Sequence, residues 1–223
     1  MRRIFSLFPL FALFSCCALV ASAQFSVSAG GGAGYVWNKA NGQGILSADA
    51  PVNPFGSCTP SAGNPFCLPT SGLDVVLMRL DGDVMVTKQF GLGGQLDFQP
   101  YRKDYGPLQF RQTFYDFNGI WAPFTSKHAV FRLEGGIGGS HTGFYFTQSG
   151  CIGTAVCSSA TSSVGSANHF DVHFGGGVML FLSSHIYVKP MIDVHYVPGF
   201  TDQFNSNLTP SAMFTIGYSS SER

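Results

Sequence analysis

The chain has 223 residues, of which only 11% are charged, and its 12 basic and 12 acidic residues cancel. A soluble domain usually carries about 25% charged residues, so this chain is unusually poor in them. A balanced charge also provides no basic surface for nucleic acid, and we expect no nucleic-acid partner.

The first segment of the chain has the three parts of a secretory signal peptide. Two arginines follow the initiating methionine, residues 4–20 are mostly apolar, and residues 21–23 form an A-x-A cleavage site. We therefore expect residues 1–23 to be removed and residues 24–223 to form one domain. A membrane-anchoring helix is the alternative, but Pro9 and the small residues at the end of the segment argue against it.

The rest of the chain has no run of 18 consecutive apolar residues, which is the length that a transmembrane helix needs. An exported chain with few charges and no spanning helix is then either a soluble β-domain or an outer-membrane β-barrel. The periodicity of the sequence has to decide whether it is β-structure at all.

Residues 25–37 are the first predicted strand, although their glycines weaken the alternation of polar and apolar residues. Glycine in a strand often marks a bend or a close approach, which a small curved barrel requires. A polar segment rich in Pro, Gly, Asn and Ser follows at residues 38–72. It contains Cys58 and Cys67, the first of two cysteine pairs.

Apolar and polar residues alternate in each of the later predicted strands, and a period of two indicates β-structure. In residues 73–87, Asp81-Gly82 could form a hairpin turn. We predict one continuous strand instead, because the turn would create two short strands and an odd total. The eight predicted strands are residues 25–37, 73–87, 90–100, 111–122, 128–146, 169–182, 186–198 and 210–218.

The segment from His169 to Pro198 shows the alternation most clearly. Only residues 183–185 separate its two halves, so we predict a tight hairpin. Each strand has about 12 residues, more than the ~9–11 that a tilted strand needs to cross a bilayer. Pro190 lies inside the second strand, where a closed barrel has no free edge, and we expect a β-bulge there.

The second cysteine pair, Cys151 and Cys157, lies in a Ser-, Thr-, Gly- and Ala-rich segment at residues 147–168, which we predict to be a loop. Four cysteines in an exported chain predict disulfides. Three connectivities are possible, and we favour the local one, in which each pair closes its own loop. A zinc site is disfavoured because neither pair has C-x-x-C spacing.

The predicted connections alternate regularly in length along the chain. The long ones are residues 38–72, 101–110, 147–168 and 199–209, and a short turn separates each pair of them. Short turns at one end and long loops at the other are typical of an outer-membrane barrel. The sequence therefore predicts an all-β fold, an eight-stranded antiparallel up-and-down transmembrane barrel.

One face of the predicted strands is polar and the other is bulky and apolar. A soluble barrel would turn the apolar face inward, whereas a membrane barrel turns it outward. The large apolar side chains would overfill a narrow lumen, and each arginine or lysine facing lipid would cost roughly 2–4 kcal/mol. We therefore place the charges inside as a paired network, which comprises Arg79, Asp81, Asp83, Asp97, Asp116, Arg132, Glu134, His169, Asp171, His173, Lys189, Asp193 and His195.

Aromatic residues near the predicted strand ends support a membrane barrel, which carries an aromatic girdle at each interface. The two predicted girdles are Trp37, Tyr101, Tyr145 and Tyr196 at the long-loop end, and Phe90, Trp121, Phe124 and Tyr218 at the short-turn end.

Residues 25–218 resemble the small outer-membrane β-barrel proteins of bacteria with two membranes, the OmpA-type and OmpX-type eight-stranded barrels. The resemblance rests on the signal peptide, the eight strands, the alternation of loop lengths and the glycine runs at residues 135–136 and 175–177. It implies a monomer in contact with outer-membrane lipid, with both termini in the periplasm, inserted by the barrel assembly machinery. Such barrels usually end in an aromatic residue, whereas here five residues follow Tyr218.

The sharpest local pattern is His169, Asp171 and His173, which share one strand face about 7 Å apart, with His195 on the paired strand. A metal or proton-titrating site is one interpretation, and membership of the lumen network is the one we favour. Ser140-His141 and Ser184-His185 would face opposite sides of a strand, so neither pairs a nucleophile with a base. The sequence thus predicts no catalytic residue, metal or cofactor.

The sequence therefore favours a non-enzymatic outer-membrane barrel with a structural or surface-interaction role. Its disulfide-clipped loops, residues 38–72 and 147–168, would face an extracellular partner, because function often concentrates in loops held on a rigid scaffold. The alternatives are a soluble periplasmic ligand-binding barrel and a barrel hydrolase that modifies lipid A. Eight strands leave no aqueous channel, so a general porin is disfavoured.

Overall fold

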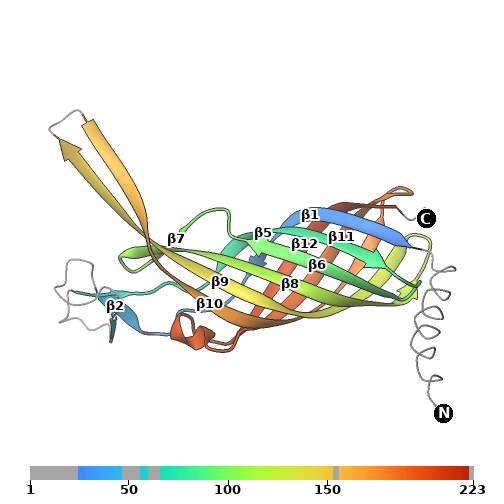
Figure 1. Ribbon diagram of the computed structural model, residues 1–223, viewed down its shortest axis with the longest axis horizontal. Coiled ribbons are helices and arrows are strands. Elements are labelled where there is room, and N and C mark those ends of the chain that lie inside the picture. The colour runs from blue at the N-terminus through green and yellow to red at the C-terminus, as the bar shows by residue number, and fades with distance from the viewer. Residues whose placement is uncertain (1–24, 47–55, 60–65, 153–155, 221–223) are drawn as a thin grey trace, which may run out of the picture.

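The computed structural model describes residues 25–46, 56–59, 66–152 and 156–220 (Figure 1). The predicted signal peptide, residues 1–23, lies outside this range. Most of the described residues belong to strands. None of the described segments is a helix long and apolar enough to cross a membrane.

Eight strands form a closed antiparallel barrel, which confirms the predicted fold. Each of these strands pairs with the next along the chain, and the last pairs with the first. The short β7 is not part of the barrel wall, so β6 pairs directly with β8. The barrel strands are β1 (Ser26–Val36), β5 (Val75–Met85), β6 (Phe90–Phe98), β8 (Leu108–Thr125), β9 (Ala129–Ile152), β10 (Val156–Phe181), β11 (Ile186–Tyr196) and β12 (Leu208–Ser219). The strand β5 runs unbroken through Asp81-Gly82, as predicted.

The long connections contain structure of their own at the end of the barrel that we call the loop end. Three short strands form a separate sheet, β7 pairs with the start of β8, and one 3-10 turn precedes β12. These elements are β2 (Gly44–Leu46), β3 (Ser57–Cys58), β4 (Cys67–Pro69), β7 (Lys103–Tyr105) and η2 (Phe200–Asp202).

The prediction of a loop at residues 147–168 is wrong, because β9 and β10 continue through most of it as paired strands. The pairing of β8 with β9 starts at Gln109 and Tyr145, so residues 146–152 and 156–162 pair only with each other. They form a two-stranded arm that projects beyond the barrel at the loop end (Figure 1). Ser, Thr and Gly allow main-chain pairing without alternating in polarity, so this segment shows no period of two.

The predicted bulge at Pro190 is also wrong. Pro190 pairs in register with Phe214 of β12. On the other side, β11 pairs with β10 in the same register at Gly177–Met191 and at Leu180–Val188. Only the residues between these two pairs are unpaired on this side. The sheet accommodates the missing N–H by a local gap in the ladder and needs no extra residue. A bulge does occur in β10, between Ser163 and Gly165.

The two faces of the barrel wall differ sharply in polarity. Large apolar side chains cover the outside, among them Leu80, Leu96, Tyr115, Phe117, Ile137, Phe170, Phe174, Ile192, Phe214 and Ile216. Charged side chains on the intervening positions are buried inside. The inside-polar, outside-apolar arrangement predicted for the strands is therefore the observed one.

Candidate functional site

Arg79 is the centre of the polar interior. Its Nε and Nη2 donate to the two carboxylate oxygens of Asp97 at 2.7 and 2.5 Å, and its Nη1 donates to Asp193 Oδ2 at 2.7 Å. All three side chains are at most 1% exposed. This bidentate and bridging geometry is what allows charges to stay buried in a narrow lumen.

A second group of ions lies closer to the short turns. Arg132 Nη2 is 2.9 Å from Asp83 Oδ2, and its Nε is 3.4 Å from Glu134 Oε1. Lys189 Nζ donates to Asp81 Oδ2 at 2.6 Å and lies 3.6 Å from the same Glu134 oxygen. Glu134 thus connects the two cations into one network.

The third group joins two histidines to carboxylates. His195 Nδ1 is 2.7 Å from Asp171 Oδ2 and 3.8 Å from Asp116 Oδ2. His173 Nε2 is 3.1 Å from Asp193 Oδ1, which links this group to Arg79. Buried Oδ1 atoms of Asp116 and Asp171 have no hydrogen-bond partner in the described part of the chain.

His169 does not join the other histidines. It is half-buried at the loop end, where its Nε2 lies 3.1 Å from Gln203 Oε1 and its ring packs edge-on against Phe200. Asp171 pairs with His195, and His173 pairs with Asp193. The three polar residues that share a face in the sequence therefore contact three different partners.

Glycines make room for this network. A Cβ on Gly136 would collide with Asn118, and one on Gly138 would collide with Asp116. A Cβ on Gly175 would collide with the Asp193 carboxylate. Larger residues at these positions would displace the groups that hold the ions.

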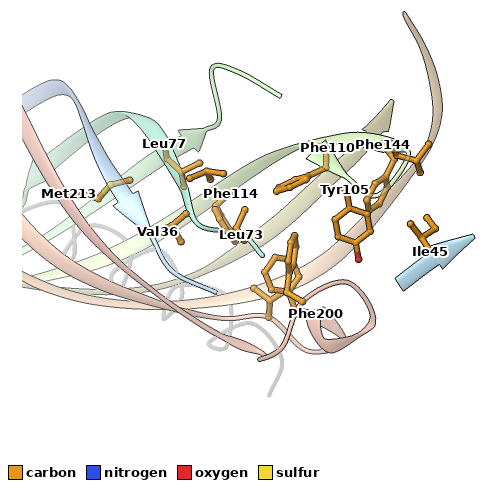
Figure 2. Close-up of a cluster of buried hydrophobic side chains, with 14 residues drawn as sticks. Val36, Ile45, Leu73, Leu77, Tyr105, Phe110, Phe114, Phe144, Phe200 and Met213 are labelled. Carbon is orange, nitrogen blue, oxygen red and sulfur yellow. The ribbon is translucent and has the colours of Figure 1, made fainter. Parts of the chain in front are cut away.

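A cluster of buried apolar residues closes the interior at the loop end (Figure 2). We call it the loop-end cluster: Val36, Ile45, Leu73, Val75, Leu77, Tyr105, Leu108, Phe110, Phe114, Phe144, Val197, Phe200, Phe204 and Met213. Phe114 stacks on the His195 ring with centroids 4.4 Å apart, so this cluster rests directly on the ions. Burial raises the pKa of Tyr105 to about 12, and its hydroxyl donates to the Gln203 carbonyl at 2.7 Å.

A smaller apolar cluster closes the opposite end of the interior. Its buried members are Ala122, Val130, Met179 and Tyr187, with Met85 and Phe181 packed against them. The ions therefore lie between two apolar layers, where water is scarce and ion pairs are weakly screened.

The disulfide predicted between Cys58 and Cys67 is present and joins β3 to β4. The other predicted disulfide involves Cys151 and Cys157, which are in register across β9 and β10, but their side chains lie outside the described part. A cleft of about 230 Å³ separates the clipped sheet from the barrel mouth. Amides and hydroxyls line it together with two rings: Asn41, Gln43, Gly44, Ile45, Ser57, Thr70, Tyr105, Phe144, Asp202 and Gln203.

The predicted aromatic girdles consist mostly of exposed side chains. Trp37 and Tyr196 are exposed at the loop end. Tyr145 is half-buried with the Arg102 guanidinium 4.3 Å from its ring centre, and Tyr101 is 82% exposed. At the turn end the exposed rings are those of Phe90, Trp121, Phe124 and Tyr218.

Solved structures of small outer-membrane proteins have a similar fold. The OprG outer-membrane protein of Pseudomonas aeruginosa is 11% identical, with a TM-score of 0.49 over 88% of this chain and 96% of that one. The attachment invasion locus protein Ail of Yersinia pestis is also 11% identical, with a TM-score of 0.45 over 88% of this chain and 98% of that one. Neisserial surface protein A is 11% identical, with a TM-score of 0.46 over 87% and 95%. The sequence matches no protein-family model and no curated protein.

Sequence reasoning missed the loop-end cluster. Tyr105 and Phe110 lie in a predicted polar loop, as do Phe200 and Phe204. The signal available was the presence of large aromatic residues in segments otherwise made of polar residues, since such residues rarely stay exposed without a partner.

Proposed function

We propose that this chain is an integral outer-membrane β-barrel that acts as a rigid anchor for a binding surface at its loop end. The observation that carries the proposal is the polarity of the wall, with buried ions inside and large apolar side chains outside. A protein in water would hide that apolar surface, whereas acyl chains accept it.

The filled interior favours an anchor over a transport or ligand-binding role for the barrel lumen. Ion pairs occupy its middle, and apolar clusters occupy both ends. An interior of this kind leaves no space for the ligand of a periplasmic binding barrel or for an aqueous channel. Ser140 accepts a hydrogen bond from Gln112 inside the barrel, whereas His141 bonds Asn168 outside it. The two side chains therefore do not pair as nucleophile and base, which is consistent with a non-enzymatic role.

Two structures at the loop end support a role in binding. The arm side chains at residues 147–148 and 158–162 are exposed, and β10 pairs with β11 only from Val172 onward. Its earlier residues therefore have main-chain groups along one edge to which an extended peptide could add as a further strand. The Cys58–Cys67 bridge restrains the neighbouring sheet beside a cleft of mixed polarity.

Membrane insertion is tested by refolding the urea-denatured protein with and without detergent micelles. We expect folding only with detergent, with β-rich circular dichroism and a gel mobility that changes on boiling. In cells the protein should fractionate with the outer membrane. A folded, monodisperse protein in detergent-free buffer would overturn the proposal.

Orientation is tested with two cysteine variants at opposite ends of the barrel. Ser159→Cys lies on the arm and Ser126→Cys lies in a short turn, and both positions are exposed. A membrane-impermeant maleimide should label Ser159→Cys in intact cells, and it should label Ser126→Cys only after the envelope is opened. The reverse pattern would place the arm in the periplasm and refute a surface role.

A further inference from the structure

The polar interior has an unequal distribution of charge that simple ion pairing does not resolve. Its described carboxylates are Asp81, Asp83, Asp97, Asp116, Glu134, Asp171 and Asp193, and its arginines and lysines are Arg79, Arg132 and Lys189. Seven negative and three positive charges leave four in excess when the histidines are neutral. Buried charge of this size requires bound protons or a bound cation.

The excess is local. Arg79 forms ion pairs with Asp97 and Asp193. Arg132 and Lys189 form ion pairs with the carboxylates near the short turns. Asp116 and Asp171 have no arginine or lysine partner among the described residues, and a single imidazole, that of His195, lies between them. Asp116 also accepts a long 3.4 Å hydrogen bond from Gln95.

The geometry points to a divalent metal site formed by Asp116, Asp171 and His195, from the three strands β8, β10 and β11. One ligand atom of each residue lies within 4.8 Å of those of the other two. Around a zinc ion with ligand bonds of about 2.0–2.1 Å, tetrahedral ligands are about 3.3 Å apart. The distances from His195 Nδ1, 2.7 Å to Asp171 and 3.8 Å to Asp116, lie on either side of that value.

Two further features suit a metal. Asp116 and Asp171 are at most 4% exposed, and their Oδ1 atoms have no hydrogen-bond partner in the described part of the chain. The other ring nitrogen of His195 lies 4.0 Å from Asp97 Oδ2, and Arg79 fixes that carboxylate. A histidine ligand commonly donates its other ring N–H to a carboxylate, and Asp97 stands on that side of the ring, at a distance longer than a hydrogen bond.

The donor set of one imidazole and two carboxylates selects a transition ion of intermediate softness, such as Zn²⁺, over Ca²⁺ or Mg²⁺. The bound ion reduces the local excess of charge. Because Phe114 stacks on His195 from the loop end, exchange through the barrel mouth is obstructed and the ion enters during folding.

The test is to refold the full chain in detergent with equimolar Zn²⁺ or Co²⁺, remove loosely bound metal with chelator, and measure retained metal by mass spectrometry. We expect one equivalent per folded chain, and Co²⁺ absorption bands of a site with nitrogen and oxygen donors. His195→Gln and Asp171→Asn should lose the metal. His169→Gln is the matched control and should keep it, because His169 bonds Gln203 at the mouth.

Folding is scored for each variant by its gel mobility before boiling. If His195→Gln fails to fold, X-ray absorption at the metal edge of the wild-type protein still tests the inference, because it identifies the ligand atoms. Folded wild-type protein that retains no metal would overturn the inference, because bound protons would then have to balance the excess charge. Sulfur ligation, or retention of the metal by folded His195→Gln, would overturn it too.

Discussion

Replacing Arg79 by methionine should destabilise the barrel more than any exposed substitution, because it leaves two buried carboxylates without their cation. Asp97 and Asp193 are 0% exposed, and Arg79 supplies three short hydrogen bonds to them. Removing one partner of a buried ion pair costs about 3–5 kcal/mol. We expect Arg79→Met to lower the free energy of unfolding by that amount, and to impair folding if the barrel is less stable than this.

A triple variant separates uncompensated charge from lost packing. Arg79→Met with Asp97→Asn and Asp193→Asn removes the cation and both anions together, and should recover most of the loss. Arg111→Met is the control, since the exposed Arg111 side chain donates to the Pro100 carbonyl and to no other group among the described residues. It should change stability by less than about 0.5 kcal/mol.

The assay is urea-induced unfolding from lipid vesicles, followed by the fluorescence of the two tryptophans, Trp37 and Trp121. The reasoning is refuted if Arg79→Met behaves like Arg111→Met. It is refuted equally if the triple variant is no more stable than the single one, because the cost would then come from packing.

Three further substitutions test other parts of the structure. Leu80→Arg places a charge on the outer face and should cost about 2–4 kcal/mol in vesicles, whereas Val164→Arg at the loop end should cost little in the same urea titration. Phe200→Ala creates a cavity in the loop-end cluster and should cost about 3–5 kcal/mol, detected as faster hydrogen exchange around it before the barrel opens. Tyr105 has a folded-state pKa raised from 10.0 to about 12, so its stabilising contribution is complete below pH 10.0 and is lost as pH rises towards 12. Tyr105→Phe should remove that alkaline loss of stability, and an unchanged pH profile would contradict the assignment.

The strands could be predicted from the sequence because each wall residue faces either the interior or the outside, and the period of two records that choice. The same signal placed Arg79, Arg132 and Lys189 inside. It failed for the arm, since adjacent side chains there, at residues 147–148 and 158–162, are all exposed and burial does not alternate along the strand. Main-chain hydrogen bonds join those strands, together with side-chain contacts such as the one between the Thr147 and Thr161 hydroxyls.

The contacts between side chains across the barrel could not be predicted in the same way. Asp116, Asp171 and His195 come from three strands, and their approach depends on the register of each neighbouring pair. A single sequence shows which residues share a face but not which of them are level with one another. For the same reason the sequence predicts that His169 and His173 share a strand face, but it does not show that His169 lies at the loop end, against Phe200 of η2.

The interior is better described as three layers than as one polar network. The loop-end cluster, the ions and the smaller apolar cluster follow one another along the barrel axis. Each apolar layer keeps water from the ions, which strengthens their pairing and makes any unpaired charge costly. A filled lumen of this kind agrees with the proposal that the binding surface lies at the arm and the clipped sheet. Those loop-end structures can then vary in sequence without disturbing the ions that hold the barrel together.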